Sequence, residues 1–94
     1  MTNTVSFAGY DFPDNKACIA CVHVLNGESV LVFSHESDGD LQFMCGRKRH
    51  TIDEARVVDV DDILQLHPDL VSLPVVEMGH LAERLDPNEE WVVL

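Results

Sequence analysis

The sequence is short of basic side chains, and this shortage disfavours several kinds of partner. Its 94 residues contain 6 Lys and Arg against 17 Asp and Glu, a formal net charge of −11. Affinity for nucleic-acid phosphates and anionic membranes comes from clustered Lys and Arg. The basic run at residues 47–50 is too short to supply such a surface. We therefore predict no nucleic-acid partner and no membrane partner.

Long apolar segments and secretion signals are also missing. No segment approaches the roughly 18 apolar residues of a membrane-spanning helix. Residues 1–15 lack the basic start and apolar run of a signal peptide. The 3 cysteines are an odd number, which in a reducing compartment favours free thiols packed as small hydrophobic side chains. We expect a cytoplasmic protein without disulfides.

The common motifs of nucleotide, hydrolase and zinc sites are missing as well. The sequence has no GxGxxG, no GxxxxGK followed by Ser or Thr, and no GxSxG. Cys18 and Cys21 have CxxC spacing, but no second CxxC or HxxxH half accompanies them. Three residues apart on a strand, they would point to opposite faces. We predict no metal site and no cofactor.

The most informative segment that is present, residues 17–46, is typical of a three-stranded antiparallel meander. It is rich in Val, Ile, Cys and Phe, as strands are. Asn26-Gly27 and Asp38-Gly39 favour the positive backbone angles of two-residue hairpin turns. Strands are therefore expected at residues 17–25, 28–36 and 40–45.

The remaining segments complete a single α+β domain over residues 1–94. Residues 1–16 are expected to form an irregular N-terminal arm, with one short strand at most. Residues 56–94 predict a strand, short helices and C-terminal strands, with Asp61 as a helix N-cap and Pro68 ending that helix. Pro68 also suits the first position of a second helical turn. The expected fold is an antiparallel β-meander sheet of four to six strands with one or two short helices on one face.

The predicted hairpins place the cysteines and histidines relative to one another. Cys18 would face His35 across the first hairpin, and directly opposed residues have Cβ atoms about 4.5–5.5 Å apart. Cys21 and Cys45 would lie about 10 Å apart with Val32 between them, beyond disulfide or shared zinc ligation.

The Cys18–His35 pair supports one catalytic hypothesis, a thiol-dependent enzyme in which the imidazole draws the proton from the thiol. The alternative is structural, because Gln42, expected opposite His35, would satisfy the imidazole by hydrogen bonding. We favour the structural interpretation, and so a protein that is not an enzyme.

The acidic residues are concentrated in the second half of the chain. Residues 1–50 carry six acids and four bases, whereas residues 51–94 carry eleven acids and two bases. Such a surface suits a basic partner protein, although solubility alone also explains it. The candidate partner-binding residues are Asp59, Asp61, Asp62, Asp69, Glu89 and Glu90. A homodimer through an exposed edge strand is left open.

Several segments together resemble a family of small uncharacterised bacterial proteins. The segments are residues 30–46, with the motif Asp38-Gly-Asp-x-Gln-Phe-x-Cys-Gly46, then residues 53–58, 63–64 and 67–70, and Trp91. Related domains are grouped with immunity proteins encoded beside bacterial toxins. The resemblance, which spans residues 18–91, implies a non-enzymatic binder of immunity-like or regulatory function, and it brings no catalytic residues with it.

Overall fold

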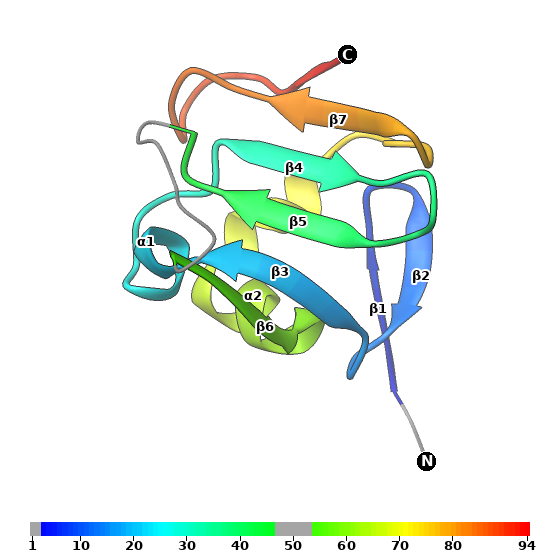
Figure 1. Ribbon diagram of the computed structural model, residues 1–94. Coiled ribbons are helices and arrows are strands. Elements are labelled where there is room, and N and C mark those ends of the chain that lie inside the picture. Colours follow the sequence, from blue (N-terminus) through cyan, green and yellow to red (C-terminus); the bar gives the residue numbers. More distant parts are fainter. Residues whose placement is uncertain (1–2, 47–53) are drawn as a thin grey trace.

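The computed structural model describes residues 3–46 and 54–94, which form a six-stranded sheet, a separate two-stranded hairpin and several short helical elements (Figure 1). The basic run at residues 47–50 lies outside the described residues. The strand order is β6-β3-β5-β4-β7-β8. The α+β class is confirmed, but the sheet is mixed and is not a pure antiparallel meander. Its strands are β3 (Ala17–Cys21), β4 (Val32–His35), β5 (Leu41–Met44), β6 (Ala55–Asp59), β7 (His80–Glu83) and β8 (Val92–Val93).

The first predicted hairpin does not form. The chain leaves β3 through a single helical turn, α1 (Val22–Leu25), and Gly27 follows it with a φ of 102°. Asn-Gly therefore ends a helix here, because a helix C-terminus needs the same positive φ as a tight hairpin. Strand β3 then pairs in parallel with β5, with Ile19 opposite Gln42, and antiparallel with β6.

The second predicted hairpin forms, but its register differs by one residue. Phe33 lies opposite Phe43, and His35 lies opposite Leu41 instead of the predicted Gln42. Gly39 has a φ of 95°, and the backbone N–H of Glu36 donates to the carbonyl of Asp40, so the loop has three residues. A shift of one residue changes which side chains share a face. Both aromatic rings therefore lie on the same, covered face.

The N-terminal segment is a hairpin, so the predicted irregular arm is wrong. Strands β1 (Thr4–Phe7) and β2 (Tyr10–Pro13) pair antiparallel in a sheet of their own. The two residues between them, Ala8 and Gly9, have φ values of 55° and 83°, as a two-residue hairpin turn requires. This hairpin packs Phe7 and Phe12 into the core.

The C-terminal half follows the predicted order of elements. Helix α2 (Val60–Leu66) follows β6 and ends before Pro68, which starts the 3-10 turn η2 (Pro68–Ser72). The helix N-cap is Asp59, two residues before the predicted Asp61. No helix among residues 3–46 and 54–94 is long and apolar enough to cross a membrane.

An aromatic cluster forms the centre of the core beneath the sheet. The ring centroid of Phe7 lies 5.7 Å from that of Phe33 and 6.0 Å from that of Phe43. His35 is buried, its ring centroid lies 5.0 Å from that of Tyr10 and 5.9 Å from that of Phe12, and its Nδ1 lies 2.8 Å from the carbonyl oxygen of Val76. One continuous set of buried side chains joins the hairpin, the sheet and α2.

Candidate functional site

Cys18 and His35 do not meet, so the predicted pair is wrong. Strand β5 lies between β3, which carries Cys18, and β4, which carries His35. Burial, helped by the negative charges of Asp59 and Asp62, raises the pKa of Cys18 to about 12. A thiol with a raised pKa is a poor nucleophile near neutral pH, because the reactive species is the thiolate. The geometry therefore removes the arrangement on which the thiol-enzyme hypothesis depended.

The structure instead gathers Cys21, His23 and Cys45 into one cluster. Their ligand atoms, two thiol sulfurs and one imidazole nitrogen, all lie within 4.8 Å of one another. The Sγ of Cys45 lies 3.9 Å from Nδ1 of His23. The predicted separation of Cys21 and Cys45 is therefore wrong, because it assumed that β4 would lie between their strands.

The parallel pairing of β3 and β5 explains the cluster. Neighbouring parallel strands end at the same edge of a sheet, so Cys21, the last residue of β3, comes close to Cys45, which follows β5. Helix α1 begins directly after Cys21 and turns the chain back, which places His23 over the same edge. The sequence pattern placed Cys21 and Cys45 apart and gave no sign that His23 lies beside them, because the decisive signal is the order of the strands.

The cluster is buried on its sulfur side and open on its imidazole side. Cys21 is 0% exposed and Cys45 is 1% exposed, whereas the His23 side chain is 21% exposed. Oε2 of Glu54 lies 3.8 Å from Nε2 of His23, the ring nitrogen that faces away from the sulfurs. Burial raises the pKa of Cys21 and the nearby Cys45 raises it further, while the backbone N–H groups of Val24 and Cys45 act in the opposite direction.

Five of the six acidic residues predicted to bind a partner fall into two groups, which lie near opposite edges of the sheet. One group lies at the end of β6 and the start of α2, and the other lies in the loop before β8. These two strands are the first and last in the sheet order. The first group is Asp59, Asp61 and Asp62, and the second is Glu89 and Glu90.

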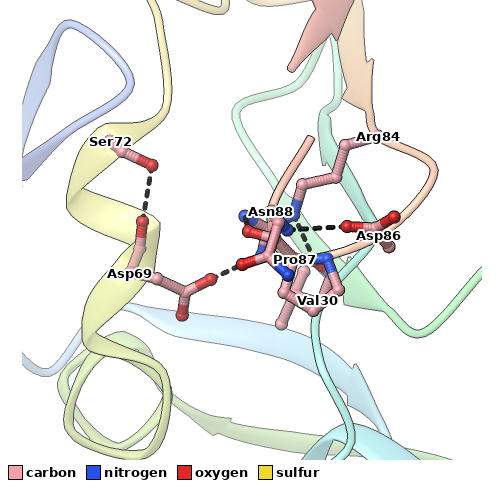
Figure 2. A network of polar contacts seen from close by, with 7 residues as sticks. All are labelled: Val30, Asp69, Ser72, Arg84, Asp86, Pro87 and Asn88. Carbon is pink, nitrogen blue, oxygen red and sulfur yellow. Dashed lines mark hydrogen bonds and ion pairs between the residues drawn. The ribbon is translucent and has the colours of Figure 1, made fainter. Parts of the chain in front are cut away.

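The sixth predicted residue, Asp69, is engaged within the molecule. Its carboxylate accepts a hydrogen bond from the guanidinium of Arg84 (Figure 2). The same guanidinium donates two bonds to the carbonyl oxygen of Val30, at 2.9 and 3.1 Å, and one to that of Pro87. It also lies 4.2 Å from the ring centroid of Trp91. Arg84 therefore ties the last strands to the start of β4 and to η2.

A groove of about 600 Å³ runs beside this network. Apolar side chains of Leu31, Leu85 and Val92 line it together with the carboxylates of Glu83, Glu89 and Glu90. Arg84 also borders the groove, but its side chain is 2% exposed and is paired with Asp69. The groove is therefore lined by apolar residues and by three acidic ones.

Comparison of the chain with models of protein families, with curated proteins and with solved structures finds no match.

Proposed function

We propose that the protein is a non-enzymatic binding domain that holds a basic segment of a partner protein in the groove beside Arg84. The observation that carries this proposal is that three glutamates and several apolar residues line one groove. The cation that borders the groove is turned inward and neutralised by Asp69. Arg84 is the one basic residue among the described lining residues of the groove, and its charge is paired with Asp69.

A segment with Lys or Arg beside apolar residues matches this surface. Long basic side chains lay their aliphatic stems on apolar surface while their charged ends reach carboxylates. Such rim charges speed association more than they tighten the complex. The immunity-like or regulatory role implied by the family resemblance is the specific form of binding that we propose, with a basic protein as the partner.

The two acidic groups provide a matched pair of variants for the test. Glu83→Gln/Glu89→Gln/Glu90→Gln removes three charges at the groove, and Asp59→Asn/Asp61→Asn/Asp62→Asn removes three at the far edge. The probe is a short fluorescent peptide of alternating Lys and Leu, followed by stopped-flow. We expect the groove variant to lower the association rate about tenfold and the far-edge variant to change it much less.

Equal losses in both variants would show that the overall negative field attracts the peptide and that the groove is not its site. No loss in either variant would refute the proposal outright. The same two variants are then compared against the partner captured from the native host, where the groove variant should associate with it clearly more slowly than the far-edge variant.

A further inference from the structure

We propose that Cys21, His23 and Cys45 form a metal site that binds one Zn²⁺ ion, with Glu54 positioning the imidazole. The inference is independent of the proposed binding groove, which lies on other residues. Two thiolates and an imidazole are donors that zinc prefers, and they suit it better than magnesium or calcium, which take oxygen ligands.

The spacing of the three donor atoms is close to what the ion requires. With Zn–S near 2.3 Å and Zn–N near 2.0–2.1 Å, tetrahedral geometry places two sulfurs about 3.8 Å apart and a sulfur and nitrogen about 3.6 Å apart. The observed Sγ–Nδ1 distance is 3.9 Å, and no distance within the cluster exceeds 4.8 Å. Side-chain movements of about 1 Å therefore bring all three donors onto one ion.

Charge and burial favour the same ion. Two thiolates neutralise the two positive charges of Zn²⁺, so a neutral unit would occupy a place where an unpaired charge would be costly. Both sulfurs are buried, whereas His23 keeps one side of the cluster accessible to an entering ion. The residues of the cluster supply three donors, so a tetrahedral ion takes its fourth ligand from outside the cluster.

Glu54 completes the arrangement from the far side of the imidazole. Ligating histidines usually donate their second ring N–H to a carboxylate, which fixes the tautomer and the ring orientation. Here Nδ1 faces the sulfurs, and Nε2 lies 3.8 Å from the carboxylate of Glu54. Glu54 is therefore a positioning residue and not a ligand.

Two other interpretations use the same atoms and predict different results. A thiol that donates a hydrogen bond from Cys45 to His23 needs no metal, and oxidation would join Cys21 and Cys45 as a disulfide. The first test is therefore made on the wild-type protein, reduced and freed of metal with a chelator. Zn²⁺ is titrated against a chromophoric chelator, and Co²⁺ is titrated in a parallel sample.

We expect one ion per chain, and for Co²⁺ a thiolate-to-metal charge-transfer band with tetrahedral ligand-field bands. X-ray absorption at the zinc edge should show two sulfur neighbours at about 2.3 Å and at least one imidazole. Failure of the reduced wild-type protein to bind stoichiometric Zn²⁺ would overturn the proposal. Zinc without two sulfur neighbours would overturn it equally, and neither result depends on a variant that folds.

Variants then assign the residues. Cys21→Ala, His23→Ala and Cys45→Ala should each lose stoichiometric binding, whereas the matched control Cys18→Ala, at a third buried cysteine, should keep it. Glu54→Gln should weaken affinity about 10- to 100-fold with one ion still bound. Zinc should raise the thermal midpoint of wild type, of Cys18→Ala and, at higher zinc concentration, of Glu54→Gln, but not that of the three ligand variants. Equal loss in Cys18→Ala would contradict the assignment.

Discussion

At the scale of single residues, Arg84 is the most constrained polar side chain in the described part of the chain. Its guanidinium is almost fully buried, and a buried cation is costly unless it is paired and hydrogen-bonded. Two backbone carbonyls, one carboxylate and the face of Trp91 meet this need. The planar fork of Arg reaches all of them at once, which a Lys ammonium does not.

Replacing Arg84 should therefore cost more stability than replacing its ionic partner. Arg84→Lys should lower the free energy of unfolding by about 2 kcal/mol or more, because several charge-assisted bonds are lost together. Asp69→Asn should cost about 1 kcal/mol, because the carboxylate is about half exposed and water screens the pair. Urea unfolding followed by Trp91 fluorescence measures both.

The exposed carboxylate of Glu77 supplies the control for this comparison. Glu77→Gln should change the free energy of unfolding by less than about 0.5 kcal/mol. If Arg84→Lys changed the free energy of unfolding as little as this control, the Arg84 network would not stabilise the packing of β7 against β4 and η2.

At the scale of elements, the sequence predicts structure well where local signals decide it. Pro68 both ends α2 and begins η2, and its ring explains the two roles because it fixes φ and removes an N–H. Strands β6, β7 and β8 also lie within or close to the predicted segments. These elements are bounded by proline, glycine and charged residues, whose effects act over only a few positions.

The pairing of the strands could not be predicted in the same way. Asn26-Gly27 suits a hairpin turn and a helix end equally, since both need a positive φ at glycine. Burial of Val24 favours the helical turn, and no local pattern reports that burial. Because β3 pairs with β5 and not with β4 as predicted, Cys18 lies apart from His35 and Cys21 lies close to Cys45. The candidate metal cluster therefore depends on which strand β3 pairs with, and this is decided by tertiary packing.

The hairpin β1-β2 offers a test of how one element is held against the segment between η2 and β7. Gly9 and Gly27 both have positive φ, but an added Cβ at Gly9 would lie 2.7 Å from Cγ2 of Val75, whereas at Gly27 it would meet nothing within 4 Å. Gly27→Ala should cost about 1–2 kcal/mol from backbone strain alone. Gly9→Ala should cost a further 1–3 kcal/mol, roughly, from overpacking.

Thermal unfolding of the two variants measures the difference. Adding Val75→Ala to Gly9→Ala should recover part of the loss, because the double variant removes the clashing methyl groups. Equal costs for the two glycine substitutions would mean that the hairpin moves away from Val75 freely, and that its packing is not fixed by this contact.

At the scale of the whole molecule, charge and sheet edges shape how the protein meets other molecules. The edge strand β8 has only two residues, and the other edge, β6, carries Arg56 and Asp59. Short and charged edges disfavour strand pairing between copies. These features argue against the edge-strand homodimer that the sequence left open. They favour the groove as the surface that contacts another molecule.

The net charge of −11 makes opposite predictions for folding and for binding when salt is added. The screening length falls from about 30 Å at 0.01 M to about 8 Å at 0.15 M ionic strength. The radius of gyration is 12.2 Å, so acids on opposite edges repel at the lower concentration and are screened at the higher one. Sodium chloride should therefore raise the thermal midpoint while slowing capture of the Lys-Leu peptide.

The far-edge variant Asp59→Asn/Asp61→Asn/Asp62→Asn separates the two effects. With three fewer negative charges, its thermal midpoint should respond less to salt than that of the wild type, because less self-repulsion remains to be screened. Its peptide capture should keep most of the salt dependence, because the groove glutamates are unchanged. A midpoint that falls with salt in both proteins would instead mean that attractive pairs such as Arg84–Asp69 outweigh repulsion across the molecule.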